Sequence, residues 1–317
     1  MMRPVFSVLS PAGAHARLTT LIFHRVTPDI DPLFPEEMHA RRFDELCAWL
    51  AGWFNVLPLD EAADRLTRKA LPARALCITF DDGYEDNCSI AMPILRRHGL
   101  TATFFIATGF LDGGRMWNDT VIESLRHAPG DQLDLHGLPG AALARYPIAS
   151  VADRRAAVDQ ILEVVKYLPV GERLEVVAEI ARRAGVVPRG DLMMSSQQVR
   201  SMRAAGMQIG AHTVTHPILA KLDAAAIEAE LRQSKATLEA LLGEAVTVLA
   251  YPNGKPGRDY GPEAVEAARR LGFKCAVSTA PGVARAGSDV HQLPRFTPWD
   301  RTRLKFGARL AKGMLQT

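Results

Sequence analysis

The sequence predicts an α/β protein whose parallel strands alternate with helices and close into a (β/α) barrel. Two observations support this prediction. Short apolar runs alternate along the chain with stretches in which apolar residues recur every three or four positions. Polar residues capable of catalysis follow directly after several of these runs, and barrel enzymes build their active sites at the carboxyl ends of strands. The residues in such positions are His24, Asp81, Asp82, His212 and Asn253.

The first third of the chain alternates between the two patterns from the start. The apolar run at 19–25 predicts a strand. The spacing of Phe43, Cys47 and Leu50 then predicts a helix. Further along, we expect an extended segment at 54–57, a helix at 60–69, a strand at 75–81, a helix at 87–98 and a strand at 102–107. Gly99 directly follows the last of these helices and is a typical C-terminal stop.

The alternation resumes after residue 195. An apolar strand is expected at 207–211. Ile227, Leu231 and Leu238 then mark one face of a long amphipathic helix that runs from Asp223 to Gly243. The remaining elements are a strand at 246–250, a helix at 261–271 and a strand at 273–278.

Residues 110–195 interrupt this alternation. They contain Gly-Gly and Pro-Gly turns and three segments with helical spacing, at 119–127, 151–167 and 171–184. We interpret them as a helical insertion, in the manner of a lid, within a single barrel domain that spans residues 1–317. Trp117, near the start of the insertion, has two interpretations: its ring stacks on a sugar, or it packs in the core.

Composition fits one sizeable enzyme domain. The chain has 317 residues, 48% of them hydrophobic, and a formal net charge of +3. It lacks a basic stripe with interleaved aromatic residues, so we expect no nucleic-acid partner. The apolar stretch Pro4–Leu9 is too short for a normal secretion signal. Four widely spaced cysteines without a Cys-x-x-Cys pair are typical of reduced thiols, and we expect a cytoplasmic protein.

Two motifs carry the chemistry. The strand at 75–81 ends in the adjacent carboxylates of Asp81 and Asp82, a pair of like charges that is costly unless a cation or a shared proton relieves it. A second strand runs into His212 and His216. Alone, the first motif is also compatible with a capped turn, and the second with chance spacing. Together they favour a divalent metal site, because two imidazoles and one carboxylate are a common ligand set for zinc and similar ions.

These motifs resemble those of the polysaccharide deacetylases, the NodB-homology group known as carbohydrate esterase family 4. The family's Thr-Phe-Asp-Asp-Gly motif is present unaltered at Thr79–Gly83, and its His-Ser/Thr-x-x-His motif is present at His212–His216. The segments at 93–100 and 101–106 resemble the helix and strand that follow the first motif. The resemblance implies a distorted (β/α) barrel, usually of seven strands, with a helical insertion in this chain.

The resemblance also implies a reaction. It identifies Asp81 as the general base, and Asp82, His212 and His216 as ligands of a divalent metal, for which zinc is favoured and other transition metals are alternatives. The implied activity is a metal-dependent hydrolase that removes the acetyl group of an amino sugar in a polysaccharide, oligosaccharide or lipid-linked saccharide.

The chain departs from the family pattern in its later motifs. The third motif usually contains an arginine that orients the base, and Ala250 stands in that position. The following residues resemble the branch that contains the poly-N-acetylglucosamine deacetylases, so Tyr251 and Asn253 are expected beside the substrate, with backbone near Asn253 stabilising the oxyanion. Arg295 has three interpretations: it replaces the missing arginine by pairing with Asp81, it binds substrate, or it lies on the surface.

The late motif that normally supplies the catalytic acid is also absent. His24 follows an early apolar strand and resembles the Tyr-His opening of the same branch, in which the early histidine protonates the leaving amine. Its ordinary pKa near neutrality suits that task. A structural histidine is the alternative, and His291 is the second candidate for the acid.

The segment 301–317 is basic, with Arg301, Arg303, Lys305, Arg309 and Lys312 and no acidic residue. Leucine, phenylalanine and methionine are interleaved among these cations. This pattern allows contact with the inner face of a membrane, and a solvated terminal helix is the favoured alternative.

The motifs are also compatible with three other functions. The fold of the family also supports deformylases and cyclic-amide hydrolases. A degenerate carbohydrate-binding protein without turnover is the third, and the intact Asp-Asp and His-His motifs argue against it.

Overall fold

The structure, a computed structural model, describes residues 2–139 and 143–316. Its chain contacts divide it into two compact units. Unit 1 consists of residues 1–29, 38–111 and 194–317, and unit 2 consists of residues 30–37 and 112–193. Among the described residues, none of the helices has both the length and the apolar character that crossing a bilayer requires.

Unit 1 is built on a parallel sheet that closes on itself. The strands lie in the order β1 (Leu18–Phe23), β3 (Ala75–Phe80), β4 (Thr103–Ile106), β7 (Gln208–Ala211), β8 (Val248–Ala250), β9 (Cys275–Pro281) and β10 (Leu293–Arg295). The short β2 (Asn55–Val56) pairs beside β3. Hydrogen bonds from Ile22 N to Phe296 O and from Phe296 N to Thr20 O join the last strand to the first. The predicted distorted (β/α) barrel is therefore confirmed.

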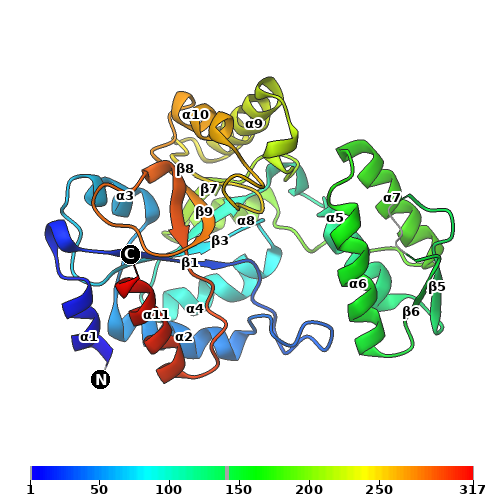
Figure 1. The fold of residues 1–317 in the computed structure, drawn as a ribbon, viewed down its shortest axis with the longest axis horizontal. Helices are drawn as coiled ribbons and strands as arrows, with labels where there is room; N and C mark the ends of the chain where they lie inside the picture. The colour runs from blue at the N-terminus through cyan, green and yellow to red at the C-terminus, as the bar shows by residue number, and fades with distance from the viewer. Residues whose placement is uncertain (1, 140–142, 317) are drawn as a thin grey trace. The chain divides into compact units, whose positions relative to one another are not determined.

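Helices cover the outer face of the barrel (Figure 1). They are α1 (Met2–Leu9), α2 (Ala40–Trp53), α4 (Met92–Arg97), α8 (Ser196–Ala204), α9 (Ala224–Leu242), α10 (Pro262–Arg270) and α11 (Arg303–Leu315). In Figure 1, α9 and α10 lie on one side of the strands, and α2, α4 and α11 lie on another. A large apolar core fills the space between helices and strands.

A second apolar cluster fills the barrel interior. Cys77, Phe105, Val248 and Leu293 belong to it, together with apolar side chains of α3 (Leu59–Thr67). Gly210 is required in β7 because a Cβ there would lie 2.6 Å from Cδ1 of Phe105. The interior is thus packed solid, and chemistry is left to the residues beyond the strand ends.

Strand alternation fixes which residues face inward. Ala75 and Cys77 of β3 and Leu293 of β10 lie in the interior cluster, whereas their neighbours Leu76 and Ile78 lie in the outer one. Because side chains of a strand alternate in direction, Asp81 and Arg295 share the inward-facing parity of these residues. The carboxyl end of the barrel therefore receives a carboxylate and a guanidinium from strands that are far apart in the sequence.

Unit 2 has an apolar core of its own. It contains α5 (Trp117–His127), α6 (Val151–Val165) and α7 (Val170–Arg183), and an antiparallel pair of strands, β5 (Gln132–Asp134) and β6 (Arg145–Pro147). The three helices lie where helical spacing predicts them. The two carboxylate oxygens of Asp31, from the short segment 30–37, accept hydrogen bonds from Nη1 and Nη2 of Arg126 on α5, at 2.8 and 2.7 Å.

Several elements differ from the prediction. The helix expected at 87–98 begins as a π-helical turn at Asn87–Ala91 before α4. The terminal helix α11 is solvated on one side only, because Phe306, Leu310 and Met314 bury one of its faces in the core. The helices α1 and α8 and the strands β5, β6 and β10 were not expected. Pro4 lies in the first turn of α1, where a helix does not need its missing N–H group.

Candidate active site

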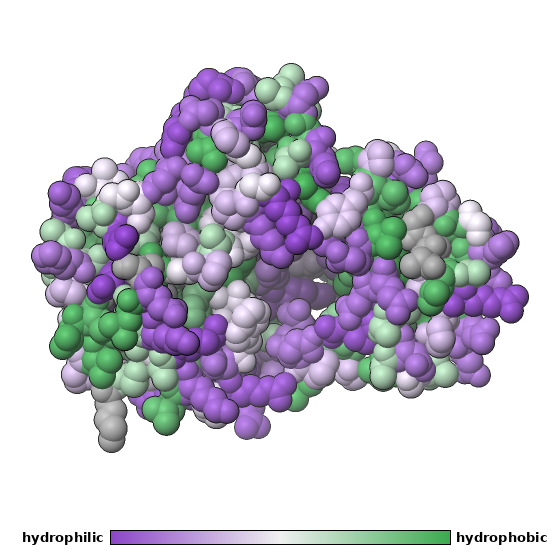
Figure 2. All heavy atoms as spheres, viewed as in Figure 1, coloured by the Kyte–Doolittle hydropathy of each residue, from purple (hydrophilic) through white to green (hydrophobic). Residues whose placement is uncertain are grey.

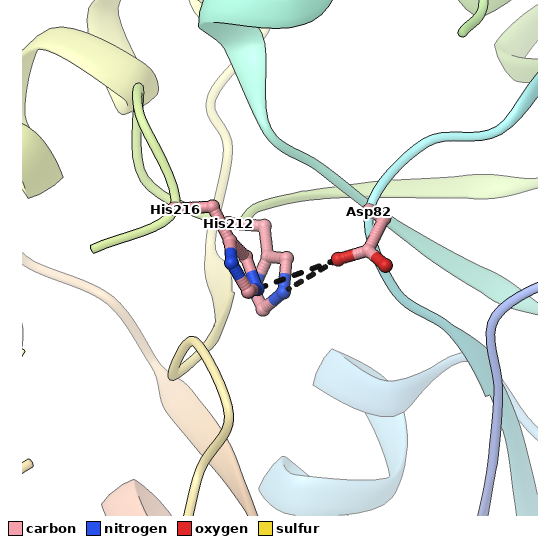
Figure 3. A group of neighbouring side chains, drawn as sticks. All are labelled: Asp82, His212 and His216. Atoms are coloured by element: carbon pink, nitrogen blue, oxygen red, sulfur yellow. Dashed lines mark ion pairs between the residues drawn. The ribbon is translucent and has the colours of Figure 1, made fainter. Parts of the chain in front are cut away.

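The motif residues Asp82, His212 and His216 converge beyond the ends of β3 and β7 (Figure 3). Both imidazoles point toward the same carboxylate oxygen. Nε2 of His212 and Nε2 of His216 each lie 3.4 Å from Oδ1 of Asp82. All three side chains are largely removed from solvent, with exposed fractions of 1% for His212, 13% for His216 and 9% for Asp82.

This arrangement fits a divalent ion. Metal–ligand bonds of about 2.0–2.2 Å in tetrahedral geometry place neighbouring ligand atoms roughly 3.3 Å apart. The Nδ1 atom of His212 lies 2.8 Å from the carbonyl oxygen of Ala250, and a carbonyl only accepts, so Nδ1 carries the proton. The Nε2 atom that faces Asp82 is therefore free of hydrogen in the neutral ring and presents a lone pair, as a metal-ligating histidine requires.

The charges of the cluster also favour a cation between these side chains. Burial alone would raise the pKa of Asp82, but the neighbouring imidazoles of His212 and His216 lower it far below its usual range. Burial lowers the pKa of His216 to about 4. Burial also opposes the charged form of His212, but Asp82 and Asp81 raise its pKa overall. The two carboxylates thus attract a positive charge to the point where the imidazoles meet.

The backbone around the site is held in an unusual conformation. Asp82, Thr213, His216 and Asn253 all have positive φ angles, between 51° and 75°, although none is glycine. Each follows a barrel strand, where a left-handed residue turns the chain sharply. Such conformations cost of order 1 kcal/mol or more for each residue and are found preferentially at functional sites.

Asp81 is held by Arg295 rather than by the imidazoles. The two guanidinium nitrogens Nη1 and Nη2 donate to the two carboxylate oxygens of Asp81 at 2.7 Å each. Nε of Arg295 donates to the carbonyl of Ser278 on β9, and Nη1 also contacts Oγ1 of Thr79. Burial alone would raise the pKa of Asp81, but the Arg295 charge lowers it overall, so the carboxylate is ionised at neutral pH.

Of the three interpretations of Arg295, the geometry fits the pairing with Asp81. The side chain has no exposed surface, and all three of its nitrogens are engaged. Neither a surface position nor direct contact with a substrate agrees with this placement.

Glu230 of α9 holds the loop that carries His216, a function that no sequence motif indicated. Its carboxylate accepts the backbone N–H groups of Val214 and Thr215, at 2.7 and 2.9 Å, and the hydroxyl of Thr215 at 2.7 Å. Helical spacing identified α9 but not which of its polar residues turns toward the site.

His24 lies directly beyond β1, and its imidazole contributes to lowering the pKa of both Asp81 and Asp82. Its side chain is exposed. Two buried neighbours fix its backbone: Nδ2 of Asn87 donates to the carbonyl of His24 at 2.8 Å, and Oδ1 of Asp86 accepts the N–H of Val26 at 3.1 Å. These contacts hold the strand end in place beside the carboxylates.

Two predicted residues lie elsewhere. Tyr251 is fully buried, its ring stacks on Tyr260 at 4.0 Å, and its hydroxyl donates to the carbonyl of His291. Alternation explains this, because Ala250 faces the barrel interior and Tyr251 the outer layer. The expected contact of the Tyr251 ring with substrate is therefore not available. Nε2 of His291 lies 2.9 Å from the carbonyl oxygen of Phe273, which precedes β9, so this imidazole points toward the amino end of that strand.

The other two predicted substrate residues are placed as follows. Asn253 is exposed beyond β8, and its carbonyl accepts the hydroxyl of Thr279 at 2.8 Å. Trp117 belongs to unit 2 and packs partly buried against that unit's core, with the Arg173 guanidinium 4.9 Å from the centre of its ring. This placement favours the core-packing interpretation of Trp117.

Comparison with known proteins agrees with the geometry. The family model described as polysaccharide deacetylase matches residues 68–276. YxkH of Bacillus subtilis (strain 168), a protein assigned to the polysaccharide deacetylases, is 22% identical over 282 residues, which cover 88% of this chain and 71% of YxkH.

Two solved structures share the fold over nearly the whole chain. The Streptococcus pyogenes deacetylase PplD in complex with acetate has a TM-score of 0.62 and 19% identity, covering 94% of this chain and 98% of PplD. IcaB from Ammonifex degensii has a TM-score of 0.61 and 20% identity, covering 96% and 98%. Since the family model spans most of the barrel, including Asp81, Asp82, His212 and His216, the chain belongs to the polysaccharide deacetylase family.

Proposed function

We propose that this protein is a metal-dependent deacetylase that hydrolyses the N-acetyl group of an amino sugar in a saccharide. The observation that carries the proposal is the juxtaposition of two separate carboxylates. Asp82 faces two imidazole nitrogens at 3.4 Å, and Asp81 is held apart from them by Arg295. A site with one carboxylate for an ion and another for a proton suits amide hydrolysis.

Asp82, His212 and His216 would hold the metal, which when bound polarises the amide carbonyl and makes a water more acidic. Asp81 takes a proton from the attacking water. It remains able to do so while paired with Arg295, because each carboxylate oxygen has two lone pairs and the arginine occupies one on each. His24 donates a proton to the departing amine nitrogen, and backbone near Asn253 stabilises the oxyanion.

The proposals for substrate class and location rest on family membership and on the cysteines. Family membership supports an N-acetylated saccharide as substrate. We place the protein in the cytoplasm because all four cysteines are buried and unpaired, which suits a reducing compartment. Zinc is the favoured ion, because imidazole and carboxylate together are a common zinc ligand set.

Acetate release tests the proposal directly. The purified protein, stripped with a chelator and reloaded with zinc or another divalent ion, would be incubated with a panel of N-acetylated and N-formylated oligosaccharides. We expect metal-dependent release of acetate. Release of formate alone would identify a deformylase, and binding without release would identify a non-catalytic protein; either outcome would contradict the proposal.

Glu230→Gln is expected to weaken metal binding about 10- to 100-fold, because a neutral amide holds the two backbone N–H groups of the His216 loop less firmly than a carboxylate. Competition with a chromogenic chelator measures the affinity. Glu239→Gln is a matched control: this carboxylate lies on the same helix and accepts the backbone N–H of Val246 at 3.1 Å. Equal affinity in the two variants would contradict the role of Glu230.

Asn87→Ala is expected to lower kcat for an amide substrate about tenfold, because it frees the backbone that places His24. The His24→Ala variant should show a larger loss of the same kind. On p-nitrophenyl acetate, whose leaving group departs without a proton, the loss of activity in both variants should be much smaller than on the amide. A proportional loss on both substrates would mean that the two residues act only through structure.

A further inference from the structure

The two ends of the chain meet on one surface of unit 1. Helices α1 and α11 pack against each other, and Gly307 on α11 permits the contact, because a Cβ there would lie 2.9 Å from Cε of Met2. Among the described residues of unit 1, the exposed large hydrophobic side chains are confined to α1, α11 and the turn before α11. They are Val5, Val8, Trp299, Leu304 and Leu315.

The helix α11 has two apolar faces instead of one. Phe306, Leu310 and Met314 point into the core. Leu304 and Leu315 lie on a second stripe, whose spacing of three, four and seven residues includes Ala308 and Ala311. The core covers the first face and touches the second at Ala311. Leu304 remains 73% exposed and Leu315 66% exposed, so a stripe of aliphatic side chains faces outward.

Basic residues adjoin this apolar stripe. At 100° per residue, Lys305, Arg309 and Lys312 share the face of α11 next to it. Arg3 and Arg301 add two more cations, and neither the first 28 residues nor residues 301–317 contain an acidic side chain. Within the described chain, no salt bridge is formed by Arg3, Lys305 or Lys312. Figure 2 shows an apolar area over α1 at the lower left, bordered by hydrophilic side chains over α11.

We propose that α1, α11 and Trp299 form a membrane-contact surface that binds the anionic lipid of a bilayer. Aliphatic side chains at the centre would enter the boundary between headgroups and acyl chains, and the cations around them would meet lipid phosphates. Tryptophan is favoured at this boundary, since its ring is apolar and its N–H finds a polar partner. The inference extends the expected contact of residues 301–317 to a surface built from both chain ends, and it does not depend on the catalytic assignment.

The charges favour a bilayer over a second copy of the chain. A symmetric dimer through this surface would bring the same unpaired cations together, and like charges facing each other across an interface oppose association. An anionic membrane supplies an apolar phase for the valines and leucines and a negative charge for the lysines and arginines.

Vesicle sedimentation of the full-length protein tests the proposal. We expect it to sediment with phosphatidylcholine vesicles that contain phosphatidylglycerol, to remain in solution with phosphatidylcholine alone, and to be released by salt. Val8→Asp/Leu304→Asp should lower binding about tenfold or more by removing the apolar contact. Lys305→Glu/Lys312→Glu should do so by reversing two charges.

Two control variants make the same kinds of substitution away from this surface. Val187→Asp changes a side chain that is 95% exposed in unit 2, and Arg96→Glu/Arg200→Glu makes the same change of charge on α4 and α8. Both should bind vesicles as the unchanged protein does. Equal binding by the surface variants, or no binding by the unchanged protein, would overturn the proposal.

Two further measurements distinguish the remaining outcomes. Activity on a soluble saccharide should be retained in all four variants, so a failure of the proposed catalysis would leave the membrane result intact. Sedimentation equilibrium that shows a dimer dissociated by Val8→Asp/Leu304→Asp, without vesicle binding, would assign the surface to self-association and overturn the membrane proposal.

Discussion

Asp81→Asn is expected to lower kcat by about 10²- to 10⁴-fold while metal content stays unchanged, because the amide cannot accept the proton of the attacking water. The residue lies beside the proposed ligands without being one of them, and its two oxygens face Arg295. Metal analysis by mass spectrometry and a steady-state assay of acetate release check the two halves of this prediction.

Asp82→Asn is the matched comparison. This variant also replaces a carboxylate by an amide, at the neighbouring residue. We expect it to lose both metal and turnover, since Asp82 faces both imidazoles. The assignment of roles would be wrong if Asp81→Asn lost its metal, or if it kept near-normal turnover. Circular dichroism spectra of both variants establish that the barrel is intact.

Arg295→Met is expected to destabilise the protein by about 3–5 kcal/mol, because it leaves the buried Asp81 carboxylate without a partner. The pair is almost fully buried, at 0% exposure for Arg295 and 4% for Asp81. Urea unfolding measures the loss. The pKa of Asp81 should also rise in the variant, since burial would no longer be offset by the guanidinium charge, and the acid limb of kcat/KM should move to higher pH.

Two further variants are compared with Arg295→Met in the same unfolding experiment. The double variant Asp81→Asn/Arg295→Met removes both charges and should recover much of the lost stability. Arg203→Met breaks the exposed pair with Glu244, in which both side chains are 43% exposed, and should cost less than about 1 kcal/mol. A similar small cost for Arg295→Met would show that the buried pair does not hold the barrel end together.

The barrel was predictable because most of its strands are apolar runs and most of its helices have an apolar stripe. The exceptions have physical reasons. Strand β10 has three residues, one of them proline and one arginine, so neither its length nor its composition is typical of a strand. In β5 and β6 only the middle residue is buried, and three residues are too few to show an alternation.

The candidate site was predictable to the extent that its residues fall in contiguous motifs. Thr79–Gly83 and His212–His216 contain the three proposed metal ligands and the proposed base, whose roles stay a prediction. Glu230 and Asn87 were not predictable, because each acts through backbone groups of a loop that is distant in sequence. For Arg295 the sequence left three roles open. Its pairing with Asp81 depends on β10, a strand that the sequence does not reveal.

The pair between Asp81 and Arg295 also has a consequence for biosynthesis, because 214 positions separate its two members. While the nascent chain leaves the ribosome, Asp81, the proposed general base, is present long before its guanidinium partner. Until the final strand docks beside the first, the carboxylate lacks the cation that keeps it ionised in a dry environment. On the proposed role of Asp81, hydrolysis in a refolding or translation assay would report the closure of the whole barrel, and a chain that ends before residue 295 would lack the partner of its proposed base.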